Sequence, residues 1–167
     1  MPRSAIAAAK FRGSNARLTT AQIGRCGELL VQLRLLAIGV DSAPMSTDVG
    51  VDLVAYSPKS RRPLTIQVKA NLRSKPGGGR GKAALDWWIP ADSPAQFIAL
   101  ADHSSENVWL LSRQELALHA QQRSSGRFHI YMYTDPTAKA RKLGRLAHSH
   151  EFERFLLPNC AHRVFGI

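Results

Sequence analysis

Two short runs decide the fold class: Val51–Tyr56, which reads VDLVAY, and Leu64–Ala70, which reads LTIQVKA. In both runs every second residue is apolar, which is the side-chain period of a β-strand with one buried face. The residues between them read SPKSRRP and form a polar segment with a proline near each end. An antiparallel hairpin is the simplest connection for two strands joined in this way.

A long amphipathic helix is predicted before this hairpin. Thr19 and Gln22 have the spacing of a capping box, in which each side chain binds a backbone N–H at the start of a helix. Apolar residues then recur at helical spacing up to about Ile38. Gly39 is a natural stop, because glycine readily adopts the left-handed conformation that ends many helices.

After the hairpin the pattern predicts a glycine-rich loop and several short elements. The loop is Arg73–Lys82, which reads RSKPGGGRGK. The expected strands are Leu85–Ile89, Phe97–Ala101, Val108–Leu111 and Phe128–Tyr133, and the expected helices run from the Ser112 cap to about Gln122 and over His150–Leu157, ending before Pro158. The predicted fold is therefore a mixed α/β (α+β) domain with a central sheet and flanking helices.

The length and composition fit one domain outside the membrane. A chain of 167 residues is long enough for a single core. We expect a flexible basic arm at residues 1–18 and one folded domain at residues 19–167. No apolar run approaches the roughly 20 residues that span a bilayer, and Ala5–Ala9 is too short for a secretory core. Two cysteines make no disulfide framework, so we expect a cytoplasmic protein with reduced thiols.

The charge favours a polyanionic partner. Lys and Arg number 23 against 12 Asp and Glu, for a formal net charge of +11. Such a surplus favours nucleic acid, although solubility or association with ribosomes would also explain it. The hairpin turn and the glycine-rich loop carry no acid, and their expected contacts with DNA phosphates are Lys59, Arg61, Arg62, Arg73, Lys75, Arg80 and Lys82. Trp87 and Trp88 could stack on bases, although one of the pair is expected in the core.

Polar residues interrupt the two strands at positions that call for a partner. Gln67 and Lys69 are two residues apart, so both project from one face of the sheet. Asp52 lies between apolar residues, where a carboxylate is costly to bury unless it is hydrogen-bonded, paired or bound to a cation. A hairpin can place Asp52 on the face of Gln67 and Lys69, but the sequence leaves the register open. Glu28 shares its helix face with mostly apolar residues.

These segments together resemble the PD-(D/E)xK nuclease superfamily. The similar stretches are Gly27–Val31 (GELLV), Gly50–Ala55 (GVDLVA) and Ile66–Lys69 (IQVK). They look most like the branch that contains small homing endonucleases, Mrr-type restriction nucleases and Holliday-junction resolvases. The resemblance covers about residues 23–70 and implies a restriction endonuclease-like fold, with a central mixed sheet flanked by helices.

The resemblance also implies a role for each matching residue. Asp52 would be the principal metal ligand, Glu28 would bind the metal directly or through water, and Lys69 would be the catalytic lysine. Gln67 stands where the family usually has Glu or Asp, and Val68 would supply a backbone carbonyl. Two departures stand out: no proline precedes Asp52, and the neutral Gln67 brings no charge to the metal.

The function implied by the resemblance is hydrolysis of DNA phosphodiester bonds by a Mg²⁺-dependent endonuclease, with Mn²⁺ as a substitute. The expected substrate is duplex or branched DNA, and a homodimer is expected because duplex DNA offers two antiparallel strands. One alternative keeps the fold but loses the chemistry, leaving a catalytically inactive module for DNA binding or assembly. A third reading is an RNA-processing or ribosome-associated protein.

Overall fold

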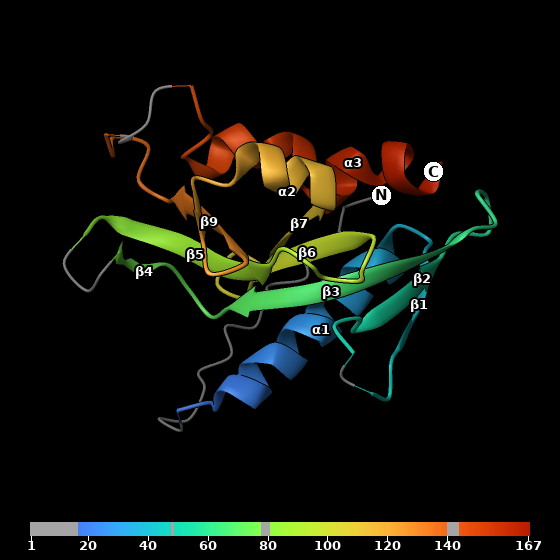
Figure 1. The fold of residues 1–167 in the computed structure, drawn as a ribbon. Coiled ribbons are helices and arrows are strands. Elements are labelled where there is room, and N and C mark those ends of the chain that lie inside the picture. Colours follow the sequence, from blue (N-terminus) through green and yellow to red (C-terminus); the bar gives the residue numbers. More distant parts are fainter. Residues whose placement is uncertain (1–16, 48, 78–80, 140–143) are drawn as a thin grey trace, which may run out of the picture.

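The computed structural model describes residues 17–47, 49–77, 81–139 and 144–167. They form two β-sheets with helices on both sides, and in Figure 1 helix α1 lies on one side of the strands while α2 and α3 lie on the other. The architecture is mixed α+β, as the sequence predicts. Most of the expected basic arm, residues 1–16, lies outside the described residues. No helix in the described part of the chain has the length and apolar character to cross a membrane.

Helix α1 (Thr20–Ala37) confirms the first predicted helix and its capping box. The Thr19 hydroxyl accepts a hydrogen bond from the Gln22 backbone N–H at 3.2 Å, and the Gln22 side chain accepts one from the Thr19 N–H at 2.8 Å. These bonds satisfy two N–H groups that have no partner within the helix. Gly39 follows the helix with a φ of +78°, the left-handed conformation that glycine adopts without strain.

The first sheet contains the predicted hairpin. Its five strands lie in the order β1-β2-β3-β6-β7, and their bounds are Asp41–Pro44 (β1), Leu53–Tyr56 (β2), Pro63–Asn71 (β3), Phe97–Asp102 (β6) and Asn107–Ser112 (β7). β2 and β3 pair antiparallel, which confirms the hairpin, and β3 then pairs parallel with β6. The sheet is therefore mixed, and β3 lies at its centre with a covered surface on both sides.

The second sheet is antiparallel and has four strands in the order β4-β5-β9-β8. Their bounds are Lys75–Pro76 (β4), Ala83–Pro90 (β5), Arg127–Tyr133 (β9) and Gln122–Ser124 (β8). β5 and β9 correspond to predicted strands and pair over their length. One face of this sheet packs on the first sheet, and the other faces outward.

Two hydrophobic clusters hold these layers together. The first joins α1 to the face of β3 that carries Ile66 and Val68. The second lies between the two sheets and includes Trp87 of β5, Ile98 and Leu100 of β6. Because successive residues of a strand point to opposite faces, β3 contributes to both sides of the sheet. The residues on either side of Val68, which are Gln67 and Lys69, therefore face the second cluster.

Several predicted boundaries were wrong, each for a physical reason. Helix α2 (Arg113–His119) ends before Gln122, because residues 122–124 pair with β9 as strand β8. The predicted helix over His150–Leu157 is a 3₁₀ helix, η2 (Ser149–Phe155), and Pro158 opens helix α3 (Leu157–Phe165) instead of ending one. Proline is well tolerated in a first helical turn, where its missing N–H would have had no partner.

Two further differences concern the hairpin strand and the glycine-rich loop. β2 begins at Leu53 and not at Val51, since Val51 is packed into the second cluster before the pairing with β3 starts. The predicted loop Arg73–Lys82 contains the two-residue strand β4, which pairs with the start of β5.

Candidate functional site

Asp52 is held against the backbone of β3 at the point where the hairpin strands meet. Its own N–H donates to the Ile66 carbonyl at 2.9 Å, and its Oδ2 accepts from the Val68 N–H at 2.6 Å. These two bonds reach the residues on either side of Gln67, and the register continues from the last pair, Leu53 with Ile66. A bond from a backbone N–H to a carboxylate is charge-assisted and stronger than a neutral one. The structure thus places Asp52 opposite Gln67.

Gln67 is buried on the same face of β3 as Lys69. Its side chain is 6% exposed, and its Oε1 is a buried oxygen that accepts no hydrogen bond from the described residues. A buried amide oxygen without a donor costs roughly 1–3 kcal/mol, so this oxygen suits a partner from outside the chain. Lys69 is half-buried beside Leu100 of the parallel strand β6. The shared face predicted from the spacing is confirmed.

Gly50 allows the chain to pass close to Gln67 before it enters β2. Its φ is +79°, and a Cβ at this position would lie 3.0 Å from Cδ of Pro94 and 3.8 Å from Nε2 of Gln67. Any other residue would be strained in its backbone and crowded against Pro94. The turn therefore forms one wall beside the Gln67 amide, and the next residue, Val51, enters the second cluster.

Glu28 lies on the helix side of the sheet and is engaged by a neighbour. Its Oε2 lies 2.6 Å from Nη1 of Arg25, one helical turn earlier, and its side chain is 24% exposed. The adjacent Gly27 packs on Ala70 and Val68, so this turn of α1 touches the segment of β3 that carries Lys69. Within the described ranges no group of three or more His, Cys, Asp and Glu side chains is arranged to hold a metal ion.

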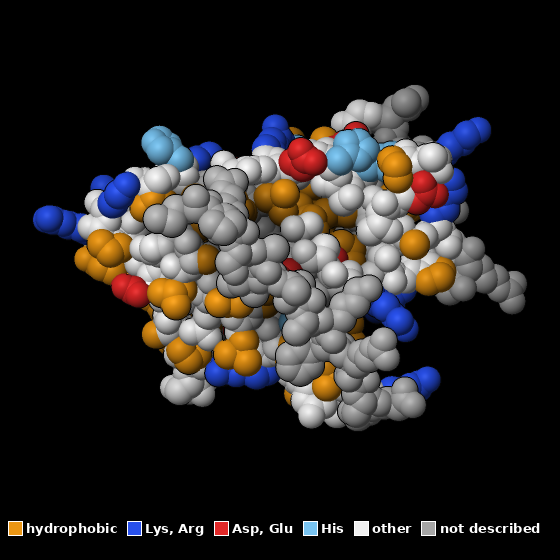
Figure 2. Space-filling view, turned by 180° about the vertical axis from the view of Figure 1, so that it is seen from behind, with side chains coloured by type: hydrophobic (Ala, Val, Ile, Leu, Met, Phe, Trp, Pro, Cys, Tyr) orange, Lys and Arg blue, Asp and Glu red, His pale blue; other side chains and the backbone are white. Residues whose placement is uncertain are grey.

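The predicted DNA-contacting residues lie toward the two ends of β3. Lys59, Arg61 and Arg62 are exposed in the hairpin turn that precedes β3, and Arg73, Lys75 and Lys82 are exposed beyond its other end, while Arg80 lies outside the described residues. Figure 1 shows these two segments at opposite ends of the long central strand. On the face drawn in Figure 2, Lys and Arg side chains lie mainly at the edges, and acidic side chains are few and scattered.

One concave surface of the described chain includes Lys75 and Lys82 from the predicted DNA contacts, but its aromatic residues were not among the predicted site residues. A hollow of about 800 Å³ lies on the outer face of the second sheet and is lined by residues that include Lys75, Lys82, His129, Tyr131 and Tyr133. The alternation in Phe128–Tyr133 indicated a strand, but the sequence did not show which strand would lie beside it. The sequence does contain a signal for this surface, because His129, Tyr131 and Tyr133 are two residues apart and so share one face of their strand.

The fold is similar to that of a solved nuclease. A bacterial homing endonuclease, I-Ssp6803I, aligns over 90% of this chain and 94% of its own length, with a TM-score of 0.57 and 16% sequence identity. Hjc, a Holliday junction resolvase from Archaeoglobus fulgidus, aligns over 64% of this chain and 82% of its own, with a TM-score of 0.44 and 19% identity. No family model and no curated protein matches the sequence.

Similarity at this level of identity establishes the fold, and the fold is the one that the motifs predict. The chain has the restriction endonuclease-like fold, with a five-stranded mixed sheet flanked by helices, in a single domain. The roles of individual residues have to be argued from the geometry of this chain.

Proposed function

We propose that the protein is a metal-dependent DNA endonuclease that hydrolyses phosphodiester bonds. One observation carries the proposal: the Asp52 carboxylate is held on β3 opposite a buried Gln67 whose Oε1 accepts no hydrogen bond from the described residues, with Lys69 on the same face. The similarity to a homing endonuclease supports it, since this arrangement stands on a fold that also carries such an enzyme.

The residues of this site suit a hard divalent cation. Mg²⁺ prefers oxygen ligands, and the chain offers the Asp52 carboxylate, the Gln67 amide oxygen and the Val68 backbone carbonyl. The unsatisfied Gln67 oxygen fits such a role, because a cation would supply the missing partner. We propose Glu28 as a further ligand, directly or through water, although it lies on the helix side of the sheet; this role requires its carboxylate to leave Arg25 and turn toward Asp52. A bound Mg²⁺, or Mn²⁺ in its place, polarises a phosphoryl oxygen and lowers the pKa of its water.

The other residues position the DNA and balance charge. The Lys69 ammonium offsets negative charge that develops on the phosphate and orients the attacking water. The second cluster packs on the face of β3 that carries Gln67 and limits the access of bulk water to this side chain. The exposed basic residues of the hairpin turn and the loop before β5 contact phosphates on either side of the scissile bond. The proposed substrate is duplex or branched DNA.

We also propose a homodimer in the cytoplasm. Leu29, Leu33 and Leu36 of α1 are 51%, 59% and 63% exposed and lie along one side of the helix. An exposed apolar stripe on a helix is typical of an interface, and a second copy would bring a second site to the opposite DNA strand. Cys26 and Cys160 are both unpaired, which agrees with a reducing compartment.

A cleavage assay with matched variants tests the proposal. Supercoiled plasmid and a four-way DNA junction are incubated with the protein and Mg²⁺ or Mn²⁺, with EDTA as the negative control. We expect Asp52→Ala and Lys69→Ala to lower the cleavage rate by about 100-fold or more. Asp92→Ala and Arg127→Ala, which remove exposed charges elsewhere, should cleave at the wild-type rate. Cleavage that survives both site substitutions would place the chemistry elsewhere.

A second candidate is a catalytically inactive DNA-binding module with the same fold. Two observations favour it: Gln67 is neutral where the family usually has a carboxylate, and the Glu28 carboxylate is already paired with Arg25. This candidate predicts DNA binding that weakens with salt but no rise in melting temperature on adding Mg²⁺. The endonuclease predicts such a rise, and Asp52→Ala should abolish it.

A further inference from the structure

The outer face of the second sheet carries a row of aromatic rings. Trp88 of β5 stacks on His129 of β9 with ring centroids 4.1 Å apart and planes 4° apart. The row continues along β9 from His129 to Tyr131 at 5.6 Å and from Tyr131 to Tyr133 at 5.3 Å, and then to His148 at 5.8 Å. These rings form one continuous surface that crosses two strands and reaches the segment before η2.

Strand alternation explains why these rings face outward. Ile130 and Met132 of β9 are fully buried in the second cluster, so their neighbours in the strand point to the other face. The same division separates the two adjacent tryptophans, since Trp87 is 3% exposed in the core and Trp88 is 41% exposed. The sequence expectation that one of the pair belongs to the core is confirmed. Trp88 remains open to a ligand.

A hollow with basic walls lies over the part of this row that β9 contributes, His129, Tyr131 and Tyr133. It has a volume of about 800 Å³, and its lining includes Lys75, Lys82 and Lys139 together with rings of β9. All three lysines are exposed. One carboxylate, Asp86, also lines the hollow. Lysines that surround a row of aromatic rings offer the two contacts that nucleic acid requires, since phosphates bind ammonium groups and bases stack on rings.

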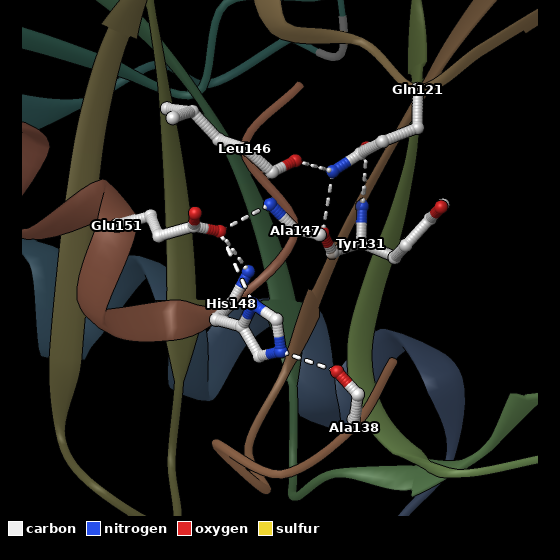
Figure 3. Close-up of polar contacts among 7 residues, drawn as sticks. All are labelled: Gln121, Tyr131, Ala138, Leu146, Ala147, His148 and Glu151. Atoms are coloured by element: carbon white, nitrogen blue, oxygen red, sulfur yellow. Dashed lines mark hydrogen bonds and ion pairs between the residues drawn. The ribbon is translucent and has the colours of Figure 1, made fainter. Parts of the chain in front are cut away.

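Hydrogen bonds beneath the surface fix the backbone of Tyr131 and the position of His148 (Figure 3). The Gln121 side chain bonds to both the N–H and the carbonyl of Tyr131, at 3.0 and 2.8 Å, and also donates to the Leu146 carbonyl at 2.7 Å. His148 Nε2 lies 2.7 Å from the Ala138 carbonyl. Glu151 accepts from the Ala147 and His148 N–H groups, each at 2.7 Å. The platform is thus built before any ligand arrives, which lowers the entropic cost of binding.

His129 has unused hydrogen-bonding capacity at the centre of this surface. Both of its ring nitrogens are buried and make no hydrogen bond within the described residues. Its Nε2 lies 3.6 Å from Oδ2 of Asp86, which is beyond hydrogen-bonding distance. Burial lowers the pKa of His129 despite the nearby carboxylate, which favours the neutral ring.

We propose that this surface binds single-stranded DNA, with unpaired bases stacked on the rings of Trp88, Tyr131 and Tyr133 and phosphates bound by the surrounding lysines. A duplex hides the faces of its bases within its own stack, so a row of rings favours unpaired bases. The choice of DNA over RNA rests on the proposed function, whereas the stacking surface itself does not. It uses none of the proposed catalytic residues, so its loss and the loss of cleavage can be measured separately.

Binding to an oligothymidine of about 12 nucleotides tests this proposal in EDTA, where cleavage cannot occur. Fluorescence anisotropy gives the dissociation constant, and quenching of tryptophan emission reports stacking on Trp88 because Trp87 and Trp109 are only 3% and 2% exposed. We expect Trp88→Ala and Tyr131→Ala each to weaken binding by about tenfold. Tyr56→Ala, which removes a 43% exposed ring from the first sheet, should bind as the wild type does.

Variants that keep the fold make the test independent of the alanine substitutions. Trp88→Phe retains a ring and should bind within about threefold of the wild type. Lys139→Gln should weaken binding and reduce its salt dependence. Asp86→Asn should strengthen binding, because it removes the negative charge from the hollow. Circular dichroism melting of each variant shows that it is folded at the assay temperature.

Each outcome bears on the proposal. Weaker binding by Trp88→Ala and by Tyr131→Ala supports it, provided that Trp88→Phe and Tyr56→Ala bind as the wild type does and that DNA still quenches the emission of Tyr56→Ala. Wild-type affinity in Trp88→Ala and Tyr131→Ala overturns it. It is also overturned if these variants lose as much affinity for a duplex of the same length as for the single strand, because the site would then bind phosphates alone. An oligouridine of equal length that binds more than tenfold tighter than oligothymidine overturns the assignment to DNA in favour of RNA.

Discussion

Replacing Gly27 with alanine would test how α1 is seated on β3. A Cβ added at this position would overlap Cβ of Ala70 and stand 3.5 Å from Cγ1 of Val68. The overlapping atom is attached directly to the backbone of β3, so no side-chain rotation can relieve it. Either the helix or the central strand has to move, and both carry residues of the proposed site.

The size of the effect follows from two opposing contributions. Alanine in place of glycine within a helix stabilises by about 1 kcal/mol, because it restricts the unfolded chain. Overpacking of a closely packed contact costs about 1–3 kcal/mol, and a backbone-bound methyl places this contact in the upper part of that range. We therefore expect Gly27→Ala to lower the free energy of unfolding by about 1–2 kcal/mol, a fall of about 2–8 °C in melting temperature.

Gly24→Ala is the matched control, one turn earlier in the same helix. A Cβ there meets no atom within 4 Å, so this variant should gain up to about 1 kcal/mol. Urea titrations followed by circular dichroism give both values with their m-values. Combining Gly27→Ala with Ala70→Gly removes the opposing methyl and should show a favourable coupling of about 1–2 kcal/mol. A Gly27→Ala protein as stable as Gly24→Ala would refute the close packing of α1 on β3.

Three further predictions concern buried groups. Gln67→Glu should bind Mg²⁺ more tightly than the wild type, because a second carboxylate then faces Asp52. Without Mg²⁺ the same two carboxylates repel each other, so the variant should be less stable. Calorimetric melting with and without Mg²⁺ measures both effects. Unchanged Mg²⁺ affinity would argue against a metal at this position. Burial raises the pKa of Cys160 to about 11, so iodoacetamide at pH 8 should modify Cys26 well before Cys160 in the folded protein, and equal rates by mass spectrometry would contradict this burial. Burial also lowers the pKa of His119 and of His129 below the ordinary 6.5. Below about pH 7 the unfolded chain therefore binds more protons at these two residues than the folded chain does. We expect the folded protein to lose stability for this reason as the pH falls from about 7 toward 5. A urea midpoint with the same pH dependence in His119→Gln/His129→Gln as in the wild type would show that other groups are responsible.

The parts of the fold that were predicted correctly have strong local signals. The capping box of Thr19 and the helical spacing after it specify α1 without any tertiary contact. The hairpin follows from two alternating runs joined by a proline-bounded turn. Strands β1, β4 and β8 were missed because they have four residues or fewer, and a polar sequence of that length has no detectable period.

The proposed site could be predicted in its residue types but not in its contacts. Spacing alone placed Gln67 and Lys69 on one face, whereas the position of Asp52 depends on the hairpin register, which the sequence left open. The spacing of Arg25 and Glu28 allows an ion pair on the helix, but the sequence analysis did not weigh it against metal binding. The aromatic row was missed because it needs Trp88 of β5 beside His129 of β9, a pairing between strands far apart in sequence.

Locating a metal ion by diffraction tests the central claim most directly. Crystals of the full chain soaked in Mn²⁺ give an anomalous-scattering peak wherever the ion is ordered. The proposed function predicts a peak within ligand distance of the Asp52 carboxylate and the Gln67 Oε1, on the face of β3 that carries Lys69, and its loss in Asp52→Asn. A peak bound to other residues, or crystals that remain without one at this position, would contradict a metal-dependent nuclease site on this strand.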